Sequence, residues 1–452
     1  MAIPSPLRQR AMARAIGGLL AAGMLLHSPA AAAIGLVQAY QAALQNDPTF
    51  QSAIHDYEAG KENEVLGRSG LLPNVSAVYA NSKDRADVTA TDTSGVPNLT
   101  HPKYNSRNAE VSLRQPIFNL DALARYKQGK AQASYAGAVL DTHRHEMIVR
   151  VATAYTDALF AEEQLRLASA QYDAYVEQRK ANDRLYAQGE GTRTDMLETQ
   201  ARQDQAEAQV LEMRDNVQTA RATLAGVIGQ PVQELDDLRP GFRIMPVNSS
   251  FEEWKDIALK NNPELVAGAF AVAAAHQEVN RGWAGHAPRL DFVASYAKTN
   301  AQTVDTYNQN STVRSIGIEL NIPIYAGGSV NAATRQASAG ELKAKSDLQA
   351  SNDKVMVELL KQYSAVISSV SRIHALDKAV ESGQLLITAT QQSIKGGVRI
   401  NVDLLNARQQ LYTSQRDLAQ ARYNYLLASL RLKAAAGVLD ASDIVDMATY
   451  FN

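Results

Sequence analysis

The chain has 452 residues, is 45% hydrophobic but only 6% aromatic, and carries a formal net charge of −2. A balance so close to neutral gives no reason to expect binding to nucleic acid or to an anionic membrane surface. Because the sequence contains no cysteine, it excludes disulfides, thiolate metal sites and a lipid-modified N-terminal cysteine.

Residues 1–32 are predicted to be a secretory signal peptide. Three arginines precede an apolar stretch at 15–26, and small residues that permit cleavage follow at 30–33. A membrane anchor is the alternative, but about a dozen apolar residues are too few to span a bilayer. The later sequence contains no uninterrupted apolar stretch of membrane-spanning length. The mature chain is therefore expected in the periplasm, in the outer membrane or outside the cell.

The first half of the mature chain, residues 33–240, is predicted to hold a helix, a strand hairpin and two long helices. Residues 36–68 are expected to be helical, with a break at Pro48, because proline cannot continue a helix. Alternating apolar and polar residues then predict a hairpin over about 71–118. A polar loop at 82–103 is expected to join its two strands.

The second half, residues 241–452, repeats this order. A helix is expected over 254–281, and alternation predicts a second hairpin over about 287–324. The loop between its strands, at 298–311, is shorter than its counterpart.

Long helices are expected over about 119–229 and about 329–437, the first ending at Gly229. Large apolar residues recur every seventh position from 404 to 439, and small residues follow three positions after most of them. This is the seam of a coiled coil whose small positions let helices approach closely. An unbroken helix from 329 to 394 would reach roughly 100 Å at 1.5 Å per residue.

Prolines, glycines and aspartates recur in the two halves in the same order. Asn46-Asp47-Pro48 is matched by Asn261-Asn262-Pro263, 215 residues later, and Asp195 is matched by Asp403, 208 residues later. A period of this size indicates two copies of one large module, because solenoid units are far shorter.

One chain supplies only four amphipathic strands, too few to close a barrel. Open sheet edges are not tolerated in hydrocarbon, so the strands must come from several chains. Two chains would give about eight strands and a barrel filled by side chains, whereas three would give about twelve and an aqueous lumen. An ordinary soluble sheet packed on a helix is the alternative, but each hairpin is isolated between long helices.

The module order, the duplicated Asn-x-Pro helix starts and the two Gly-x5-Asp turns resemble the TolC family of outer membrane channel proteins, over essentially the whole mature chain. The most specific segment is Gly397-Val-Arg-Ile-Asn-Val-Asp-Leu-Leu-Asn-Ala-Arg408. The resemblance implies a mainly α fold with a transmembrane β part. Each chain would contribute two β-hairpins and long antiparallel coiled-coil helices. A homotrimer would then form a 12-stranded β-barrel in the outer membrane and a 12-helix α-barrel that projects into the periplasm.

The resemblance also implies partners. Family members dock on a periplasmic adaptor protein and on an inner-membrane ABC transporter or efflux pump. The missing cysteine argues against the lipoprotein branch used in drug efflux, so the resemblance favours a passive duct for type I protein secretion over drug efflux. A periplasmic coiled-coil scaffold without a pore is a third hypothesis, which explains the heptads but not the amphipathic hairpins.

The resemblance places a gate at the periplasmic end of the helices. Gly189 and Gly397 begin the two turns that join long helices there. Asp403 matches the first position of an acidic ring at the entrance, and Asn406 holds the second position, which makes the ring less acidic. A ring of carboxylates attracts cations.

Asp195 and Arg399 match the acid and the base of a network that keeps the family's entrance closed. Ile394 stands where the family has a tyrosine, so that link is expected to be absent or rerouted. The alternative is that Asp195 and Asp403 merely cap the helices that follow them.

No catalytic constellation is evident, and neither a cofactor nor a metal is expected. His143 and His145 would point about 200° apart on a helix and therefore cannot share a metal ion. Gly327-Gly328 follows a strand but lacks the lysine of a phosphate-binding loop.

Overall fold

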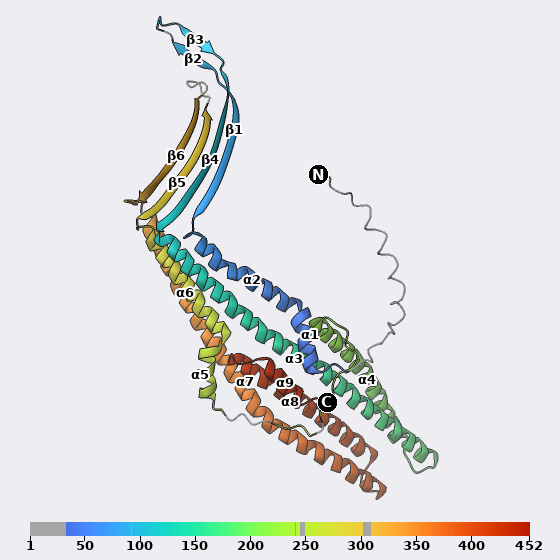
Figure 1. Cartoon of the computed structure of the whole chain (residues 1–452). Helices are drawn as coiled ribbons and strands as arrows, with labels where there is room; N and C mark the ends of the chain where they lie inside the picture. The colour runs from blue at the N-terminus through green and yellow to red at the C-terminus, as the bar shows by residue number, and fades with distance from the viewer. Residues whose placement is uncertain (1–32, 92, 240, 245–248, 302–308) are drawn as a thin grey trace, which may run out of the picture.

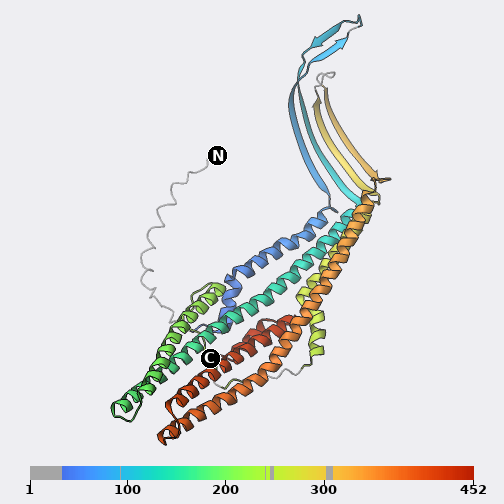
Figure 2. The same cartoon turned by 180° about the vertical axis from the view of Figure 1, so that it is seen from behind.

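The computed structural model describes residues 33–91, 93–239, 241–244, 249–301 and 309–452. The signal peptide expected at residues 1–32 lies outside the described residues. The molecule is elongated, with a curved sheet at one end and long helices at the other (Figure 1). Seen from behind, the helices end in two hairpins that point away from the sheet (Figure 2).

Each half begins with two helices separated at a proline. In the first half, α1 (Leu36–Asn46) is followed by α2 (Pro48–Ser69), which Asp47 caps by accepting a hydrogen bond of 3.0 Å from the amide of Thr49. In the second half, Asn262 caps α6 (Pro263–Ala284) after α5 (Phe251–Asn261). Proline lacks an amide hydrogen and fits the first helical turn, and the break expected at Pro48 is confirmed.

The hairpins of the two halves join into one antiparallel sheet with the strand order β1-β4-β5-β6. Val111 of β4 lies opposite Tyr296 of β5. The two hairpins stand between long helices in the sequence, as expected, but in the fold an edge strand of one half pairs with an edge strand of the other. The four strands are β1 (Asn74–Arg85), β4 (Lys103–Phe118), β5 (Arg289–Ala301) and β6 (Gln309–Asn321).

A small extra hairpin continues β1 and β4 beyond the sheet (Figure 1). Its strands β2 (Val88–Thr91) and β3 (Pro97–Thr100) lie within the segment 82–103, for which the sequence predicts a polar loop. The described residues thus contain six strands rather than the four expected. Four-residue strands are too short to give a periodic signal.

The sheet has one apolar face and one polar face. Along β4 the side chains from Lys103 to Ser112 alternate between exposed and half-buried, because the curved sheet crowds its concave face. A row on the exposed, convex face consists of Val75, Leu113, Ala294 and Ile316. The adjacent row on the concave face consists of Ser76, Ser112, Ser295 and Ser315.

Two very long helices connect the sheet to the far end of the molecule. α3 (Leu120–Ala187) has 68 residues and α7 (Ser329–Lys395) has 67, so each reaches roughly 100 Å. α4 (Arg193–Ile228) returns along α3, and α8 (Asn401–Ala435) returns along α7, before the short helix α9 (Ala441–Ala448).

The returning helices end against the helices that lead to the sheet. The Asn46 side chain donates to the carbonyl of Ile228 at the end of α4 (3.1 Å), and Asn262 donates to the carbonyl of Ala435 at the end of α8 (2.9 Å). A helix C-terminus therefore meets a helix N-terminus twice, and their opposite partial charges attract. We call these two contacts the helix joints.

The main hydrophobic core lies in the middle of the molecule, where α1, α9 and the C-terminal residues pack on α3 and α8. Tyr155 is fully buried there, donates its hydroxyl to the carbonyl of Ile34 (3.1 Å) and packs edge-on against Phe451. Burial raises the pKa of Tyr155 above its ordinary value.

Candidate functional site

The two helical hairpins end in tight turns at the pole of the molecule opposite the sheet (Figure 2). Gly189 and Gly397 adopt φ angles of 80° and 71°, the left-handed region that glycine tolerates best. The amide of Gly397 donates to the carbonyl of Ile394 (3.0 Å), and Val398 donates to Ser393 (2.9 Å). These bonds satisfy carbonyls at the end of α7 and let the chain reverse.

Asp195 lies in the first turn of α4, three residues after the cap. Thr192 is the N-cap; its hydroxyl accepts from the amide of Asp195 (3.1 Å) and donates to the Asp195 carboxylate (2.6 Å). The simple capping hypothesis for Asp195 is therefore wrong in detail, because the aspartate supports a threonine cap. A carboxylate in this turn also favours the positive end of the helix dipole.

Asp403 occupies the corresponding position of α8, but without a polar cap. The N-cap is Ile400, whose side chain cannot accept a hydrogen bond. Asp403 is half-buried, and no ion pair or side-chain hydrogen bond to it is found among the described residues. Its carboxylate therefore remains available to charges outside the protomer.

Asn406 and Arg399 have different surroundings. Asn406 is exposed and accepts a hydrogen bond of 3.2 Å from the guanidinium of Arg202, which links α8 to α4. Arg399 is also exposed, and within the described part of one protomer it makes no ion pair with Asp195. One protomer thus places all four residues near the two tips, with no contact between Asp195 and Arg399.

A buried polar cluster just above the tips joins α3, α4 and α8, and the sequence interpretation missed it. Thr199 is fully buried; its hydroxyl accepts from the side chains of Asn182 (2.8 Å) and Asn401 (3.0 Å) and donates to the carbonyl of Asp195 (2.8 Å). Gln178 donates to both asparagines (3.1 Å each). A signal was present, because Thr199 lies seven residues before Ala206 in the helix seam.

Apolar layers follow this cluster toward the middle of the molecule. Tyr175, Ala206 and Leu405 form the next layer, and Ala168, Val210 and Tyr412 form one further along. Between them Gln171 donates to Gln409 (2.7 Å). The contact between the two helical hairpins is therefore polar at the tip and increasingly apolar above it.

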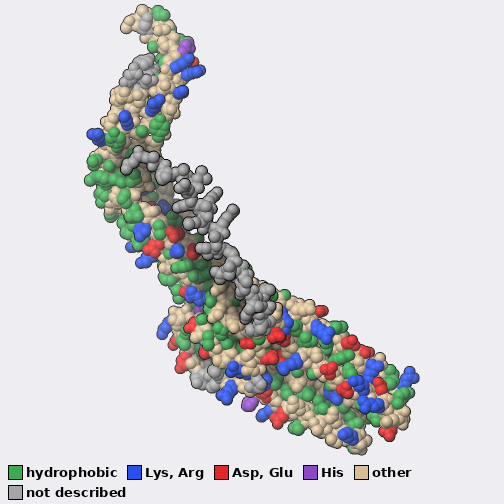
Figure 3. All heavy atoms as spheres, turned by 45° about the vertical axis from the view of Figure 1, so that its right-hand side comes forward, with side chains coloured by type: hydrophobic (Ala, Val, Ile, Leu, Met, Phe, Trp, Pro, Cys, Tyr) green, Lys and Arg blue, Asp and Glu red, His purple; other side chains and the backbone are tan. Residues whose placement is uncertain are grey.

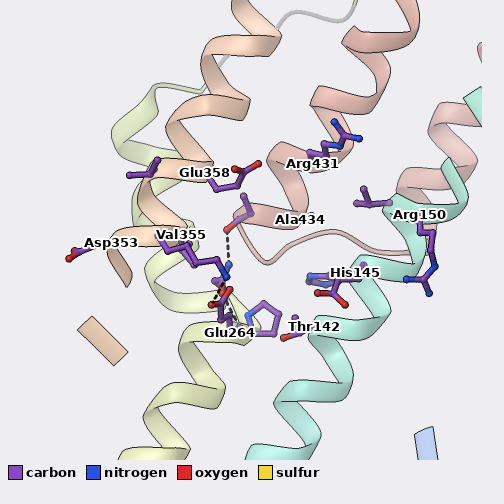
Figure 4. A pocket seen from close by; sticks show the side chains of 16 residues that line it. Thr142, His145, Arg150, Glu264, Asp353, Val355, Glu358, Arg431 and Ala434 are labelled. Carbon is purple, nitrogen blue, oxygen red and sulfur yellow. Dashed lines mark hydrogen bonds and ion pairs between the residues drawn. The ribbon is translucent and has the colours of Figure 1, made fainter. Parts of the chain in front are cut away.

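A cavity of about 840 Å³ lies beside the second helix joint (Figure 4). Lys354 of α7 donates to Glu264 at the start of α6 (3.2 Å). His145 of α3 also lines the cavity, and burial lowers its pKa below the ordinary value.

The cavity shows how the two halves differ in charge. At the first joint Asp47 pairs with Arg150 of α3. At the second joint Asn262 stands in place of Asp47. Glu358 of α7 stands in place of Arg150, because it lies 208 residues later, the same shift that relates Asp195 to Asp403. Nowhere in the described residues do three His, Asp or Glu side chains gather in a way that could hold a metal ion.

Among the helices that the structure describes, none is both long and apolar enough to cross a bilayer. The strands carry exposed apolar side chains on one face, where Ile316, Ile318 and Leu320 are 80%, 68% and 58% exposed.

Comparison with known proteins identifies the family. The sequence model described as "Outer membrane efflux protein" matches residues 39–230 and 254–438. The alkaline protease secretion protein AprF of Pseudomonas aeruginosa is 40% identical over 97% of this chain and 92% of its own length. The proteases secretion protein PrtF of Dickeya chrysanthemi is 34% identical, covering 96% and 94%. Outer membrane protein TolC of Escherichia coli is 28% identical, covering 91% and 83%.

Solved structures show the same fold at lower sequence identity. The CmeC outer membrane channel of Campylobacter jejuni superposes with a TM-score of 0.77 at 16% identity, covering 92% of this chain and 90% of CmeC. A membrane protein of Pseudomonas aeruginosa gives a TM-score of 0.78 at 17% identity, covering 90% and 91%. The mainly α fold with a few strands is thereby confirmed, and the chain belongs to the outer membrane efflux protein family, the TolC-like channels of Gram-negative outer membranes.

Proposed function

We propose that this chain is the outer membrane channel of a type I protein secretion system. The observation that carries the proposal is the pair of relatives at 40% and 34% identity, both named for protease secretion and both matched over nearly their whole length. The TolC proteins, which match at 28% identity or less, are more distant.

The proposed assembly is a homotrimer. In one protomer the sheet leaves one edge of β1 and one edge of β6 without a strand partner among the described residues. Unpaired backbone amides and carbonyls are not tolerated in lipid, so a membrane-embedded sheet must close on itself. Three copies would supply the four strands of this sheet three times and close a barrel wide enough for an aqueous lumen.

In this assembly the concave, serine-lined face of the sheet borders the lumen and the convex apolar face contacts outer membrane lipid. The chain would act as a passive duct, without catalysis of its own. Its proposed partners are a periplasmic adaptor protein and an inner-membrane ABC transporter. The two halves would be structural repeats, 33–240 and 241–452.

We further propose that the tips form the periplasmic entrance. Asp403, with its unpaired carboxylate, would line the narrowest point, and Asn406 would continue the ring. Asp195 and Arg399 would pair between neighbouring copies, since they do not meet within one. Gly189 and Gly397 would allow the sharp turns that bring these residues together.

Drug or small-molecule efflux is the second candidate, favoured by relatives such as the outer membrane efflux protein BepC of Brucella suis, at 25% identity. A periplasmic scaffold without a pore is a candidate of another class. The exposed apolar face of the sheet argues against the scaffold, because such a surface would be unfavourable in water.

A complementation experiment separates these functions. The chain is expressed in Pseudomonas aeruginosa lacking AprF and, separately, in Escherichia coli lacking TolC. The proposal expects alkaline protease to reappear in the medium of the first strain. Restored drug resistance in the second strain without protease export in the first would favour efflux. A protein that is soluble without detergent and restores neither would favour the scaffold.

A further inference from the structure

The acidic residues of the four-stranded sheet are confined to one face, where Arg114 and Arg289 accompany them. All four acidic residues of the strands, Asp84, Glu110, Asp291 and Glu319, project on the concave polar face. The convex face, which carries the apolar band, holds basic residues and no acidic residue. We call its basic residues the basic collar: Lys83, Arg85, Lys103, Arg107, Lys298 and Arg314.

The collar residues lie close to one another across the strands. Arg85 of β1 is directly opposite Lys103 of β4, and Lys298 of β5 is opposite Ala109, two residues from Arg107. Like charges directly opposite each other on one face of a sheet are destabilising. Such an arrangement is favourable when an anion from outside the chain lies between the cations.

Among the residues that the structure describes, no acidic side chain pairs with the collar. All six residues are exposed, and Arg314 lies over the ring of Tyr296 at 5.8 Å. The other five make neither an ion pair nor a side-chain hydrogen bond with any residue in the described part of the chain. Exposed lysines of the helices often do have such partners, as Lys343 has in Asp347 (2.6 Å).

The collar follows the apolar band on the side away from the helices. From the helical end outward, each strand of the sheet presents apolar residues on its convex face and then basic ones. Val75 and Lys83 of β1 are separated by roughly 26 Å along the strand, and tilting in a barrel reduces this to about 20 Å. Outer-membrane barrels have an apolar band of about 25 Å, so the collar lies at its outer boundary. In Figure 3, Lys and Arg side chains, drawn in blue, are visible along the upper part of the sheet.

We infer that the basic collar binds the phosphate groups of the phosphorylated glycolipid in the outer leaflet of the outer membrane. This inference rests on the proposed trimeric barrel, whose helices lie in the periplasm and whose distal strand ends face outward. A lipid fits better than a free anion, because its acyl chains contact the apolar band while its phosphates reach the collar. Basic residues at a membrane boundary attract anionic headgroups in this way.

The test uses two matched triple variants of the full-length protein purified in detergent. The collar variant is Lys83→Gln, Lys103→Gln and Lys298→Gln. The control variant is Lys61→Gln, Lys127→Gln and Lys130→Gln, which changes exposed lysines of α2 and α3 by the same total charge. Binding of diphosphorylated lipid A, of chemically dephosphorylated lipid A and of inorganic phosphate is measured by native mass spectrometry.

The inference expects the collar variant to bind diphosphorylated lipid A roughly tenfold or more weakly than the wild type, since each basic residue near a charged surface contributes measurably. The control variant is expected to bind like the wild type. Removing the lipid phosphates should weaken wild-type binding to a similar degree, and inorganic phosphate should bind far more weakly than lipid A.

Equal affinity of the collar variant and the wild type would overturn the inference, and so would equal binding of the dephosphorylated lipid by the wild type. The second comparison needs no variant and therefore holds even if the collar variant folds poorly. Conductance in planar bilayers is measured on the same samples. Wild-type channels that conduct without phosphate-dependent lipid binding would contradict this inference alone, whereas a wild type that forms no channel would contradict the proposed function.

Discussion

Thr199 is the residue at which three helices meet near the tips. Its hydroxyl accepts from Asn182 and Asn401 and donates to the carbonyl of Asp195, in a site with no exposed surface. A buried amide that loses its acceptor costs about 1–3 kcal/mol.

Thr199→Val keeps the shape and removes the hydroxyl. We expect it to destabilise the contact between α8 and the α3–α4 hairpin by about 1–3 kcal/mol, seen as faster hydrogen exchange at the start of α8. Thr199→Ser is the control, since it retains the hydroxyl. Equal exchange in Thr199→Val and the wild type would show that the cluster contributes nothing to holding the tip.

Asp403 is the residue with the most direct expected effect on conduction. Its carboxylate has no partner within the described residues of one protomer, and a ring of three such carboxylates would attract cations. Asp403→Ala is expected to weaken cation selectivity and block by multivalent cations in planar bilayers. Asp446→Ala, on the short helix α9, serves as the control. Unchanged selectivity in Asp403→Ala would remove this residue from the entrance.

His145 links stability to pH. Burial lowers its pKa, so between the folded and unfolded pKa values the unfolded chain binds more protons, and stability falls as the pH drops below about 6.5. Nearby Asp141 raises the pKa and Arg144 lowers it, both more weakly than burial.

We expect His145→Gln to unfold with a smaller pH dependence than the wild type between about pH 5 and pH 7. His143→Gln, on the same helix, is the control. Thermal unfolding followed by circular dichroism across this range provides the measurement. An unchanged pH dependence in His145→Gln would show that the burial of this histidine does not limit stability in acid.

At the scale of elements, the helix joints place the C-terminal ends of α4 and α8 directly against the starts of α2 and α6. Gly437 follows the end of α8 with φ of 74°, and a Cβ there would lie 2.4 Å from the backbone of Asn261. Gly189 has a φ of 80° but open space around it. Substitutions at these two glycines therefore distinguish the cost of backbone strain, which both share, from the cost of a steric clash, which only Gly437 has.

Gly437→Ala is expected to destabilise the protein clearly more than Gly189→Ala. Both pay about 1–2 kcal/mol for a left-handed backbone, but Gly437→Ala must also displace the start of α6. Thermal unfolding of the two variants in detergent measures the difference. Equal losses of stability would show that the backbone around Asn261 can move away from an added Cβ at no measurable cost in stability.

Several elements could be predicted from sequence because their signal is local. Pro48 fixes a helix break, and the heptad positions Leu404, Leu418 and Leu432 are buried as the seam requires. The pairing of β4 with β5 could not be predicted, since it joins segments about 180 residues apart and leaves no local pattern. The heptad spacing from Ala206 could have placed Thr199 in the helix seam, but its partners Asn182 and Asn401 lie on other helices that meet it only in the folded chain.

At the scale of the whole molecule, the net charge of −2 conceals a strong separation of charge. Composition alone argued against an anionic membrane surface as a partner. The register of the strands gives a detail that composition cannot: the acidic residues of the sheet all lie on one face, and its basic residues, except Arg114 and Arg289, lie on the other. An amphipathic sheet whose two outer edges have no strand partner among the described residues, and which carries an apolar band and a basic collar, is suited to closure by further copies in a membrane.

The central claim is that separate copies share one cylinder, and mass measurement tests it most directly. The mature protein is extracted from membranes with detergent, and its protein mass is determined by light scattering corrected for bound detergent. The account predicts three chains per particle and aggregation when the detergent is removed. A monodisperse single chain in plain buffer would contradict it.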